Sequence, residues 1–347
     1  MQTFRIEKLE NLPQKISVII WDINGTITLK DQLDEEVGKV IVETAVQGLQ
    51  HIFITGRDRA WIINFFVTSL RRISTKEGID FDQVLSNIWL YPELGLIYLI
   101  SPSLTPTLYE GIENHPLIIS PLRQRLATFF WQVHQLQEWK EGEDVPPRHY
   151  IIRDANGKGF LCPLIPQEIE ISVKLPDFIW SDTKEIIGTA EIIREQDNQI
   201  LRRRQTKIDL ATRIIESFLD YWEIRDVSVS PVSTAINFAP VVDDQALDKD
   251  WAAGRAIVNL AQGKNVDLSK ILKETIAIGD GKADFLFSRP IFKGDKRENI
   301  PFIFVGHGKP KVPKEQEDNT VIWATTQSGP IVTKEVLDYL KGRFQPL

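Results

Sequence analysis

The chain has little cysteine, no long apolar run and no excess of positive charge. Its single cysteine, Cys162, excludes an internal disulfide. No apolar stretch approaches the roughly 20 residues of a membrane-spanning helix, and the N-terminal residues mix charged with apolar side chains, unlike a signal-peptide core. The formal net charge of −7 argues against a protein that binds nucleic acid through general attraction to phosphates. We therefore expect a soluble, cytoplasmic protein that binds neither membranes nor nucleic acid.

The clearest structural signal is a short apolar run at residues 16–21 (ISVIIW). Its composition predicts a strand that is buried on both faces, as in the middle of a parallel sheet. The run ends at Asp22, and the turn-forming residues Asn24 and Gly25 follow. Because open α/β sheets bind ligands beyond the carboxyl ends of their strands, Asp22 is a candidate site residue.

Two later predicted strands end in the same way, with a hydroxyl or carboxyl side chain next to glycine. They are residues 52–55 (IFIT), followed by Gly56 and Arg57, and residues 275–279 (TIAIG), followed by Asp280 and, four positions later, Asp284. Packing alone does not require such residues at three strand ends. The pattern therefore predicts a shared site at one edge of the sheet.

Together with a lysine upstream of the third strand, these strand ends resemble the haloacid dehalogenase (HAD) superfamily of phosphotransfer enzymes. The family's four motifs are DxDGT, a Ser or Thr after a strand, a Lys, and GDxxxD or GDGxxD. The similar residues here, in chain order, are Asp22-Ile23-Asn24-Gly25-Thr26, Thr55, Lys249, and Gly279-Asp280 with Asp284. Each motif alone is weak, but four in the family's order make the resemblance specific. It implies a Rossmann-like α/β core with a parallel sheet.

The resemblance also implies a role for each matched residue. Asp22 would be the nucleophile, because a carboxylate is ionised near neutral pH and forms a labile acyl phosphate. Mg²⁺ would be held by a side-chain oxygen of Asp22, the backbone carbonyl of Asn24 and the carboxylate of Asp280, with Asp284 orienting a metal-bound water. Thr55 would hydrogen-bond a phosphoryl oxygen. Further phosphate- or substrate-binding candidates are Gly25, Thr26, Gly56 and Arg57, and Thr55-Gly56-Arg57 is similar to the TGR sequence of capped sugar-phosphate members. A structural alternative, in which Asp280 and Asp284 cap a helix, stays open.

Two basic residues compete for the place of the family's lysine. Lys249 opens a predicted helix and has Ala252 three residues later, which is similar to the family's KGxA pattern, although Asp250 replaces the glycine. Arg255, six residues after Lys249, could deliver the same charge to the phosphoryl group. We favour Lys249 and keep Arg255 as the alternative.

Asn24 is the main departure from the family's pattern. The family's phosphatases have Asp here, which protonates the leaving oxygen and then deprotonates the attacking water. An amide cannot exchange a proton in this way, and the loss of such help typically costs on the order of 10² to 10⁴ in rate. Four accounts remain open: a slow enzyme, a substitute acid from a second domain, a variant made to disable turnover, or a natural protein that binds phosphates without turnover.

The order of predicted elements indicates a core interrupted by an insertion. Residues 1–100 and 240–347 alternate strands and helices, so both are expected to build one catalytic core. Residues 101–239 differ, and we predict a helix over 122–139, a hairpin over 149–163, a strand over 169–175, helices over 182–222, and strands over 227–230 and 234–238. Such an α+β insertion resembles the C2-type cap of the family's sugar-phosphate phosphatase and phosphomannomutase branch. Its candidate substrate contacts are Arg153, Lys158, residues 202–204 (RRR) and Lys207.

The function that we favour is a Mg²⁺-dependent phosphohydrolase. It would form an aspartyl phosphate and act on a small phosphorylated metabolite, with a sugar phosphate as the favoured substrate. One alternative is a catalytically impaired, phosphate-binding regulatory protein, for which Asn24 is the chief evidence. Another is a phosphotransferase or phosphomutase, favoured if water is kept from the aspartyl phosphate. The sequence does not specify an oligomeric state.

Overall fold

The chain folds into two compact units, Met1–Glu110 with Asp248–Leu347 (unit 1) and Gly111–Leu247 (unit 2). The sequence-based boundaries, after residue 100 and before residue 240, fall slightly earlier in the chain. The computed structural model describes residues 4–29, 31–110, 112–118, 122, 126, 137–145, 149–153, 159–163, 178–180, 183–192, 208, 211–212, 215–216, 219–220, 223–232, 235–242, 245–294, 296–310 and 319–347. No helix in these segments is long and apolar enough to cross a membrane.

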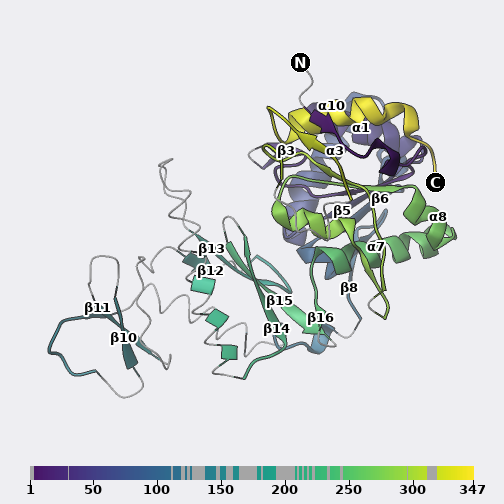
Figure 1. The fold of residues 1–347 in the computed structure, drawn as a ribbon. Coiled ribbons are helices and arrows are strands. Elements are labelled where there is room, and N and C mark those ends of the chain that lie inside the picture. The colour runs from purple at the N-terminus through teal and green to yellow at the C-terminus, as the bar shows by residue number, and fades with distance from the viewer. Residues whose placement is uncertain are drawn as a thin grey trace. The chain divides into compact units, whose positions relative to one another are not determined.

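Unit 1 is built around a nine-stranded, mainly parallel sheet (Figure 1). Neighbouring strands pair in parallel from β21 to β6, whereas β1, β7 and β8 join antiparallel at the edges. In spatial order the strands are β1 (Phe4–Ile6), β21 (Thr320–Ala324), β20 (Phe302–Phe304), β17 (Thr275–Gly279), β2 (Val18–Trp21), β5 (Gln50–Ile54), β6 (Ile88–Tyr91), β7 (Ile97–Ile100) and β8 (Thr105–Leu108). The predicted Rossmann-like α/β core is confirmed.

The sheet changes its winding direction between β2 and β17. From β2 the chain adds β5 and then β6 on one side, and from β17 it adds β20 and then β21 on the other. β2 and β17 are parallel neighbours, with Val18 opposite Thr275 and Trp21 opposite Ile278, so both end at the same edge. Such a reversal point is where open α/β sheets bind ligands. It brings together residues that follow two strands about 250 positions apart.

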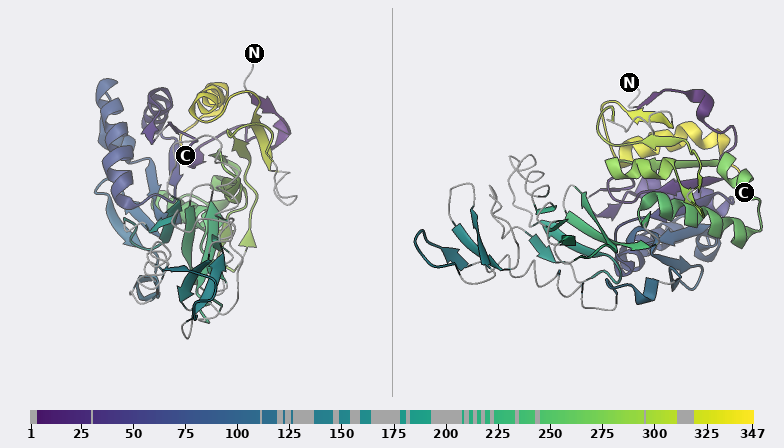
Figure 2. Two further views of the ribbon diagram at one scale, coloured as in Figure 1. Left: turned by 90° about the vertical axis from the view of Figure 1, so that its left-hand side faces the viewer. Right: turned by 60° about the horizontal axis from the view of Figure 1, so that its bottom comes forward.

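Helices cover both faces of this sheet (Figures 1 and 2). α1 packs against α3, α4 and α10 on one face, and α7 packs against α8 and η7 on the other. The α-helices are α1 (Glu35–Val46), α2 (Arg59–Trp61), α3 (Thr68–Lys76), α4 (Phe81–Leu85), α7 (Lys249–Lys264), α8 (Leu268–Lys273) and α10 (Pro330–Leu340). The other short elements are the 3₁₀-helices η1 (Leu9–Asn11), η3 (Glu93–Gly95), η7 (Lys282–Ser288) and η8 (Lys341–Arg343), and the hairpins β3 (Thr28–Leu29) with β4 (Gln32–Leu33) and β18 (Ile291–Phe292) with β19 (Lys296–Arg297).

Local sequence explains where α1 begins and which face it buries. The Asp34 side chain accepts a hydrogen bond from the Val37 amide, which caps the first turn. Val37, Ile41 and Ala45 recur at helical spacing and are fully buried. The single helix predicted from residue 58 to residue 72 is different, because Ile62–Val67 forms the π-helix η2 between α2 and α3.

A buried histidine ties β5 to β2 and α1. The Trp21 Nε1–H donates to His51 Nδ1 at 3.1 Å, and His51 Nε2 lies 3.0 Å from Thr44 Oγ1. Because Nδ1 accepts, the neutral ring carries its proton on Nε2. Burial lowers the pKa of His51 to about 3, and protonation would also place an N–H against the Trp21 donor.

We expect His51 to make the fold acid-labile. The folded pKa lies below the unfolded value of about 6.5, so the contribution of His51 is complete above that pH and is lost as the pH falls. The loss is about 1.4 kcal/mol of unfolding free energy per pH unit between about pH 6 and pH 4. Urea unfolding of the native protein and of His51→Asn, which keeps an acceptor for Trp21 but does not titrate, measures this. Parallel pH profiles for the two proteins would contradict it.

The described strands of unit 2 form two antiparallel sheets. One contains β10 (His149–Arg153), β11 (Gly159–Pro163) and β9 (Gln137–Trp139); the other contains β12 (Phe178–Trp180), β13 (Gly188–Ile192), β15 (Ala235–Val242) and β14 (Val227–Val232), with β16 (Gln245–Ala246) on β15 and the 3₁₀-helix η4 (Ile112–Asn114) outside the sheets. The predicted hairpin over 149–163 is confirmed, with His149 opposite Pro163 and Arg153 opposite Gly159. The strands predicted near 227 and 234 correspond to β14 and β15.

Two helix predictions in unit 2 were wrong in part. Gln137–Trp139, at the end of the helix predicted over 122–139, forms strand β9 on β11. Gly188–Ile192, inside the predicted helical region 182–222, forms β13 and pairs with both β12 and β15. Sheet pairing thus outweighs local helical spacing here. The strand predicted over 169–175 lies outside the described residues.

Candidate active site

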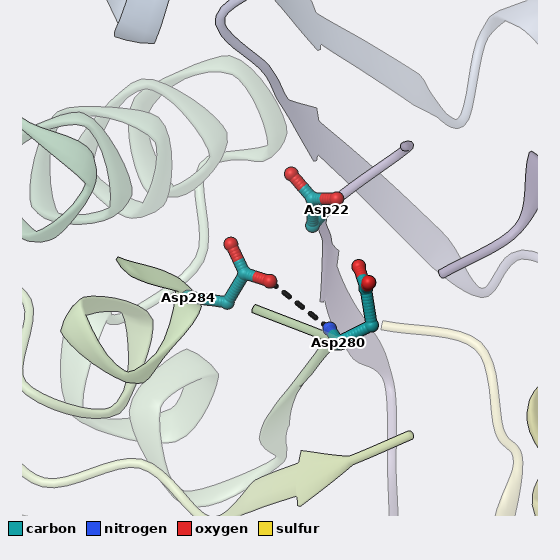
Figure 3. A group of neighbouring side chains, drawn as sticks. All are labelled: Asp22, Asp280 and Asp284. Atoms are coloured by element: carbon teal, nitrogen blue, oxygen red, sulfur yellow. Dashed lines mark hydrogen bonds between the residues drawn. The ribbon is translucent and has the colours of Figure 1, made fainter. Parts of the chain in front are cut away.

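Three carboxylates meet at the edge where β2 and β17 end (Figure 3). Asp22 follows β2, Asp280 follows β17, and Asp284 lies in η7. One oxygen of each carboxylate lies within 4.8 Å of the others. Residues 22 and 280, which the sequence placed at two strand ends, are therefore brought to one cluster together with Asp284.

Asp284 also caps the turn that carries Asp280. Its Oδ2 accepts a hydrogen bond from the backbone amide of Asp280, at 3.0 Å (Figure 3), and another from that of Gly281, at 2.7 Å. The capping role considered from sequence is thus present, but it uses only one oxygen. Oδ1 faces Lys249 instead, so the same side chain shapes the loop and contributes to the cluster.

Close packing at the cluster requires glycine at position 25. Gly25 has a φ of +80°, and a Cβ there would lie 2.3 Å from Asp280 Oδ2. The neighbouring Thr26 hydroxyl donates to Asp280 Oδ1 at 2.9 Å and lies 3.5 Å from Asp22 Oδ2. Thr26 is fully buried, so this hydroxyl orients the two carboxylates.

Lys249 bridges two of the three carboxylates. Its Nζ donates to Asp22 Oδ1 at 2.7 Å and to Asp284 Oδ1 at 2.5 Å, and it lies 5.0 Å from the centre of the Phe287 ring. Lys249 is the first residue of α7, which Asp248 caps. The ammonium is buried, so both ion pairs are shielded from water.

Arg255, the alternative to Lys249, lies elsewhere. Its guanidinium donates to the backbone carbonyls of Gly95 and Leu108, and it stacks over the rings of Tyr109 and Trp251. Within the described residues it forms no hydrogen bond or ion pair with the three carboxylates. Of the two basic candidates, the structure brings only Lys249 to Asp22.

A second polar group lies beside the cluster at the end of β5. The Asn24 amide donates through Nδ2 to Thr55 Oγ1, at 3.5 Å, and accepts at Oδ1 from Arg57 Nε, at 3.1 Å. The Arg57 backbone amide also donates to Thr55 Oγ1, at 3.2 Å. Gly56 links these two residues, and a Cβ there would meet only Leu94, at 3.9 Å. Asn24, Thr55 and Arg57 thus form one hydrogen-bonded set.

The cluster carries more negative charge than its lysine neutralises. Burial, and then the charge of Asp284, raise the pKa of Asp22 to about 8, against the opposing effect of Lys249. Burial and Asp284 likewise raise the pKa of Asp280 to about 6. Burial would lower the pKa of Lys249, but Asp22 and Asp284 outweigh it and the net shift is upward. The single ammonium group of Lys249 therefore does not balance the negative charge of the three carboxylates.

Solved structures resemble the chain over most of its length. A haloacid dehalogenase-like hydrolase from Bacteroides thetaiotaomicron superposes with a TM-score of 0.50 at 15% sequence identity, over 94% of this chain and 100% of that one. The chain has the HAD fold. A HAD subclass IIB sugar phosphatase (TM-score 0.47, 13% identity, 94% and 99% coverage) and a trehalose-6-phosphate phosphatase related protein (0.43, 12%, 94% and 97%) are also similar. A scan of protein-family models and a search of curated proteins gave no match.

The donor set of this HAD-fold cluster fits a divalent cation. Carboxylate oxygens are the ligands that Mg²⁺ prefers, and three are within reach of one another. Burial and the charge of Asp284 raise the pKa values of Asp22 and Asp280, and a divalent ion would supply positive charge to these carboxylates. Among the described residues, Asp22, Asp280 and Asp284 are the one group of at least three acidic, histidine or cysteine side chains that lie close enough together to hold a metal ion.

Sequence reasoning missed several residues that hold the site in place. Asp31 accepts a hydrogen bond from Arg57 Nη2, and the Trp61 ring lies 5.0 Å from the guanidinium carbon of Arg57. The Thr333 hydroxyl, on α10, donates to the carbonyl of Thr26 at 2.7 Å. No local pattern marks Asp31 and Thr333, because their contacts join separate segments of the chain, whereas Trp61 lies four residues after Arg57.

Proposed function

We propose that the protein is a Mg²⁺-dependent phosphohydrolase in which Asp22 accepts the phosphoryl group of a small phosphorylated metabolite. The observation that carries the proposal is the meeting of Asp22, Lys249, Asp280 and Asp284 at the reversal point of a HAD-fold sheet. A surface ion-pair network would not need to bury a lysine among three carboxylates at the ligand-binding edge of the sheet.

Each residue has a separate task in this proposal. The Asp22 carboxylate attacks phosphorus, and Lys249 holds it by one oxygen while adding positive charge beside the phosphoryl group. Thr55 offers its hydroxyl to a phosphoryl oxygen. Asp22, the backbone carbonyl of Asn24 and Asp280 would hold Mg²⁺, with Asp284 supporting them. The bound ion would offset the negative charge of the transferred group.

Trapping of the phosphorylated protein tests this function. The protein is mixed with Mg²⁺ and acetyl phosphate, quenched in acid and weighed intact. We expect the mass of one added phosphoryl group, located on Asp22 by peptide mapping, and phosphate release in steady state. Asp22→Asn removes both, whereas the matched change Asp338→Asn, at an exposed position of α10, leaves them unchanged.

The second candidate function is a regulatory protein that binds phosphates without turnover, and the amide of Asn24 beside the nucleophile favours it. It predicts Mg²⁺-dependent binding of inorganic phosphate, no phosphorylated protein and no phosphate release. A phosphotransferase or phosphomutase would form the phosphorylated protein and pass the group to an added sugar instead of to water. The trapping experiment with and without such an acceptor separates the three.

For the substrate, we propose a small metabolite selected by residues 101–239 acting as a C2-type cap. Sugar phosphates are the first class to assay. The candidate contacts named from sequence, Arg153, Lys158, residues 202–204 and Lys207, have side chains outside the described residues. Alanine substitution of each basic residue is the corresponding screen, and a contact would raise the KM for the substrate without abolishing phosphorylation of Asp22 by acetyl phosphate.

A further inference from the structure

The side chain of Asn24 is held at both ends beside Asp22. An arginine Nε–H can only donate, so the atom of Asn24 that faces Arg57 is the carbonyl oxygen and the NH₂ group faces Thr55. These contacts fix the orientation of the amide, and a carboxamide transfers no proton near neutral pH in any orientation. Position 24 cannot serve a leaving group as an acid, and no rotation of this amide would change that.

Arg57, the neighbour of Asn24, is a fixed positive charge. Asp31 and the Trp61 ring hold its guanidinium in addition to Asn24. Among the described residues, its Nη1 has no hydrogen-bond partner, which leaves donors for an anion. A guanidinium does not lose its proton in proteins, so Arg57 can stabilise a negative leaving group but cannot protonate one.

The remaining charged groups at the site are already engaged. Lys249 donates to Asp22 and Asp284, and the carboxylates face one another in the proposed cation site. Within the described part of unit 1, no further acid or base contacts Asp22, Asn24 or Thr55. Asn24 and Arg57 therefore offer hydrogen bonds and positive charge but no transferable proton.

We propose that the substrates of this site are phosphoric anhydrides, such as acyl phosphates and nucleoside diphosphates or triphosphates, whose leaving oxygen departs as a stable anion next to Arg57. The inference rests on the proposed function and narrows its substrate class. An Asp22 oxygen forms a bond to phosphorus, and the bond between phosphorus and the bridging oxygen breaks. The electron pair stays on that oxygen, which leaves as a carboxylate or phosphate without a proton.

Hydrolysis of the aspartyl phosphate, the second step of the reaction, also lacks a proton-transferring side chain at position 24. Water must attack the phosphorus of the aspartyl phosphate, releasing the Asp22 carboxylate and phosphate, and its proton passes to bulk water because position 24 cannot accept it. We therefore expect formation of the aspartyl phosphate from an anhydride to be faster than its hydrolysis, so that the phosphorylated protein accumulates.

A series of phosphate donors tests the inference on the native protein. With Mg²⁺ present, the rate of Asp22 phosphorylation is measured by quenched intact mass for acetyl phosphate, 4-nitrophenyl phosphate, phenyl phosphate and glucose 6-phosphate. We expect the rate to fall steeply along this order, by at least about 10²-fold from the first to the last, since unaided departure depends on the stability of the leaving anion. A burst of one equivalent of 4-nitrophenol per protein should precede the steady state.

The Asn24→Asp variant supplies the missing proton carrier. This variant should raise the rate of Asp22 phosphorylation by glucose 6-phosphate by about 10²- to 10⁴-fold and remove the burst of 4-nitrophenol. The rate with acetyl phosphate should change little. Should native protein use glucose 6-phosphate as fast as acetyl phosphate, in an Asp22-dependent reaction, the inference is wrong although the proposed function stands. If no donor phosphorylates Asp22, the proposed function itself fails.

Discussion

Lys249→Met is expected to lower the unfolding free energy of the metal-free protein by about 3–5 kcal/mol, the cost of leaving buried charges without their partner. Lys249 Nζ lies 2.7 Å from Asp22 and contacts Asp284, and all three side chains are buried. Methionine keeps the length of the side chain but not its charge. The two carboxylates then face each other without an intervening cation, and they can relieve the repulsion only by taking up a proton.

This destabilisation should therefore depend on pH and on Mg²⁺. The pKa of Asp22 is raised to about 8, so at low pH this carboxyl group is neutral and the loss should shrink, whereas at pH 8 the loss should be larger. Saturating Mg²⁺ should restore part of the stability, because the ion supplies positive charge to the same cluster. Urea unfolding of the native and Lys249→Met proteins, at pH 5 and pH 8, with a chelator or with Mg²⁺, measures this loss of stability. Lys293→Met, at an exposed position, is the control and should change stability by less than about 0.5 kcal/mol.

The position of Asp22 and Asp280 could be predicted from the sequence, because their signal is local. Each follows a strand whose residues are all buried, and buried parallel strands read as continuous apolar runs. The parallel order of these strands then places their carboxyl ends at one edge. The resemblance to the HAD motifs added Lys249 and Asp284, which no strand pattern marks.

The choice between Lys249 and Arg255 could not be made from spacing alone. Six residues along an α-helix turn the side chain by about 600°, so the two lie about 120° from each other around the axis. Only one can face the carboxylates, and the rotation of α7 about its axis decides which. That rotation depends on the packing of the buried residues of α7, which include Trp251, Ala252 and Ala256, and α7 contacts η3, η7, β5 and β6.

The contacts of Asn24 were beyond sequence reasoning for a different reason. Arg57 lies 33 positions from Asn24 and 26 positions from Asp31. All three residues lie in loops, where no regular spacing predicts which side chains meet. From the sequence, the side chain of Asn24 was a missing acid and Arg57 was a separate binding candidate. The structure joins the two by a hydrogen bond, which bears on the leaving groups that the site can use.

Binding of Mg²⁺ to the three carboxylates should stabilise the fold, and more strongly at pH 8 than at pH 6. Without the ion, the pKa values of Asp22 and Asp280 are raised to about 8 and about 6, above the unfolded value of 3.8. Their contribution to stability is therefore present at acid pH and is lost as the pH rises through these values. A cation displaces the protons that remain, so its apparent affinity should rise about tenfold per pH unit for each proton displaced.

The measurement is the thermal unfolding midpoint across a Mg²⁺ titration at each pH, with no substrate present. At a concentration 100 times the dissociation constant, the ion should add about 2.7 kcal/mol to the unfolding free energy. Asp280→Asn removes a ligand and should abolish most of this shift, whereas Asp338→Asn, exposed on α10, should retain it. Because the readout is stability, it reports on the cluster itself and not on turnover. A shift that survives Asp280→Asn, or that is larger at pH 6 than at pH 8, would mean that the cation binds elsewhere and that these carboxylates balance their charge in another way.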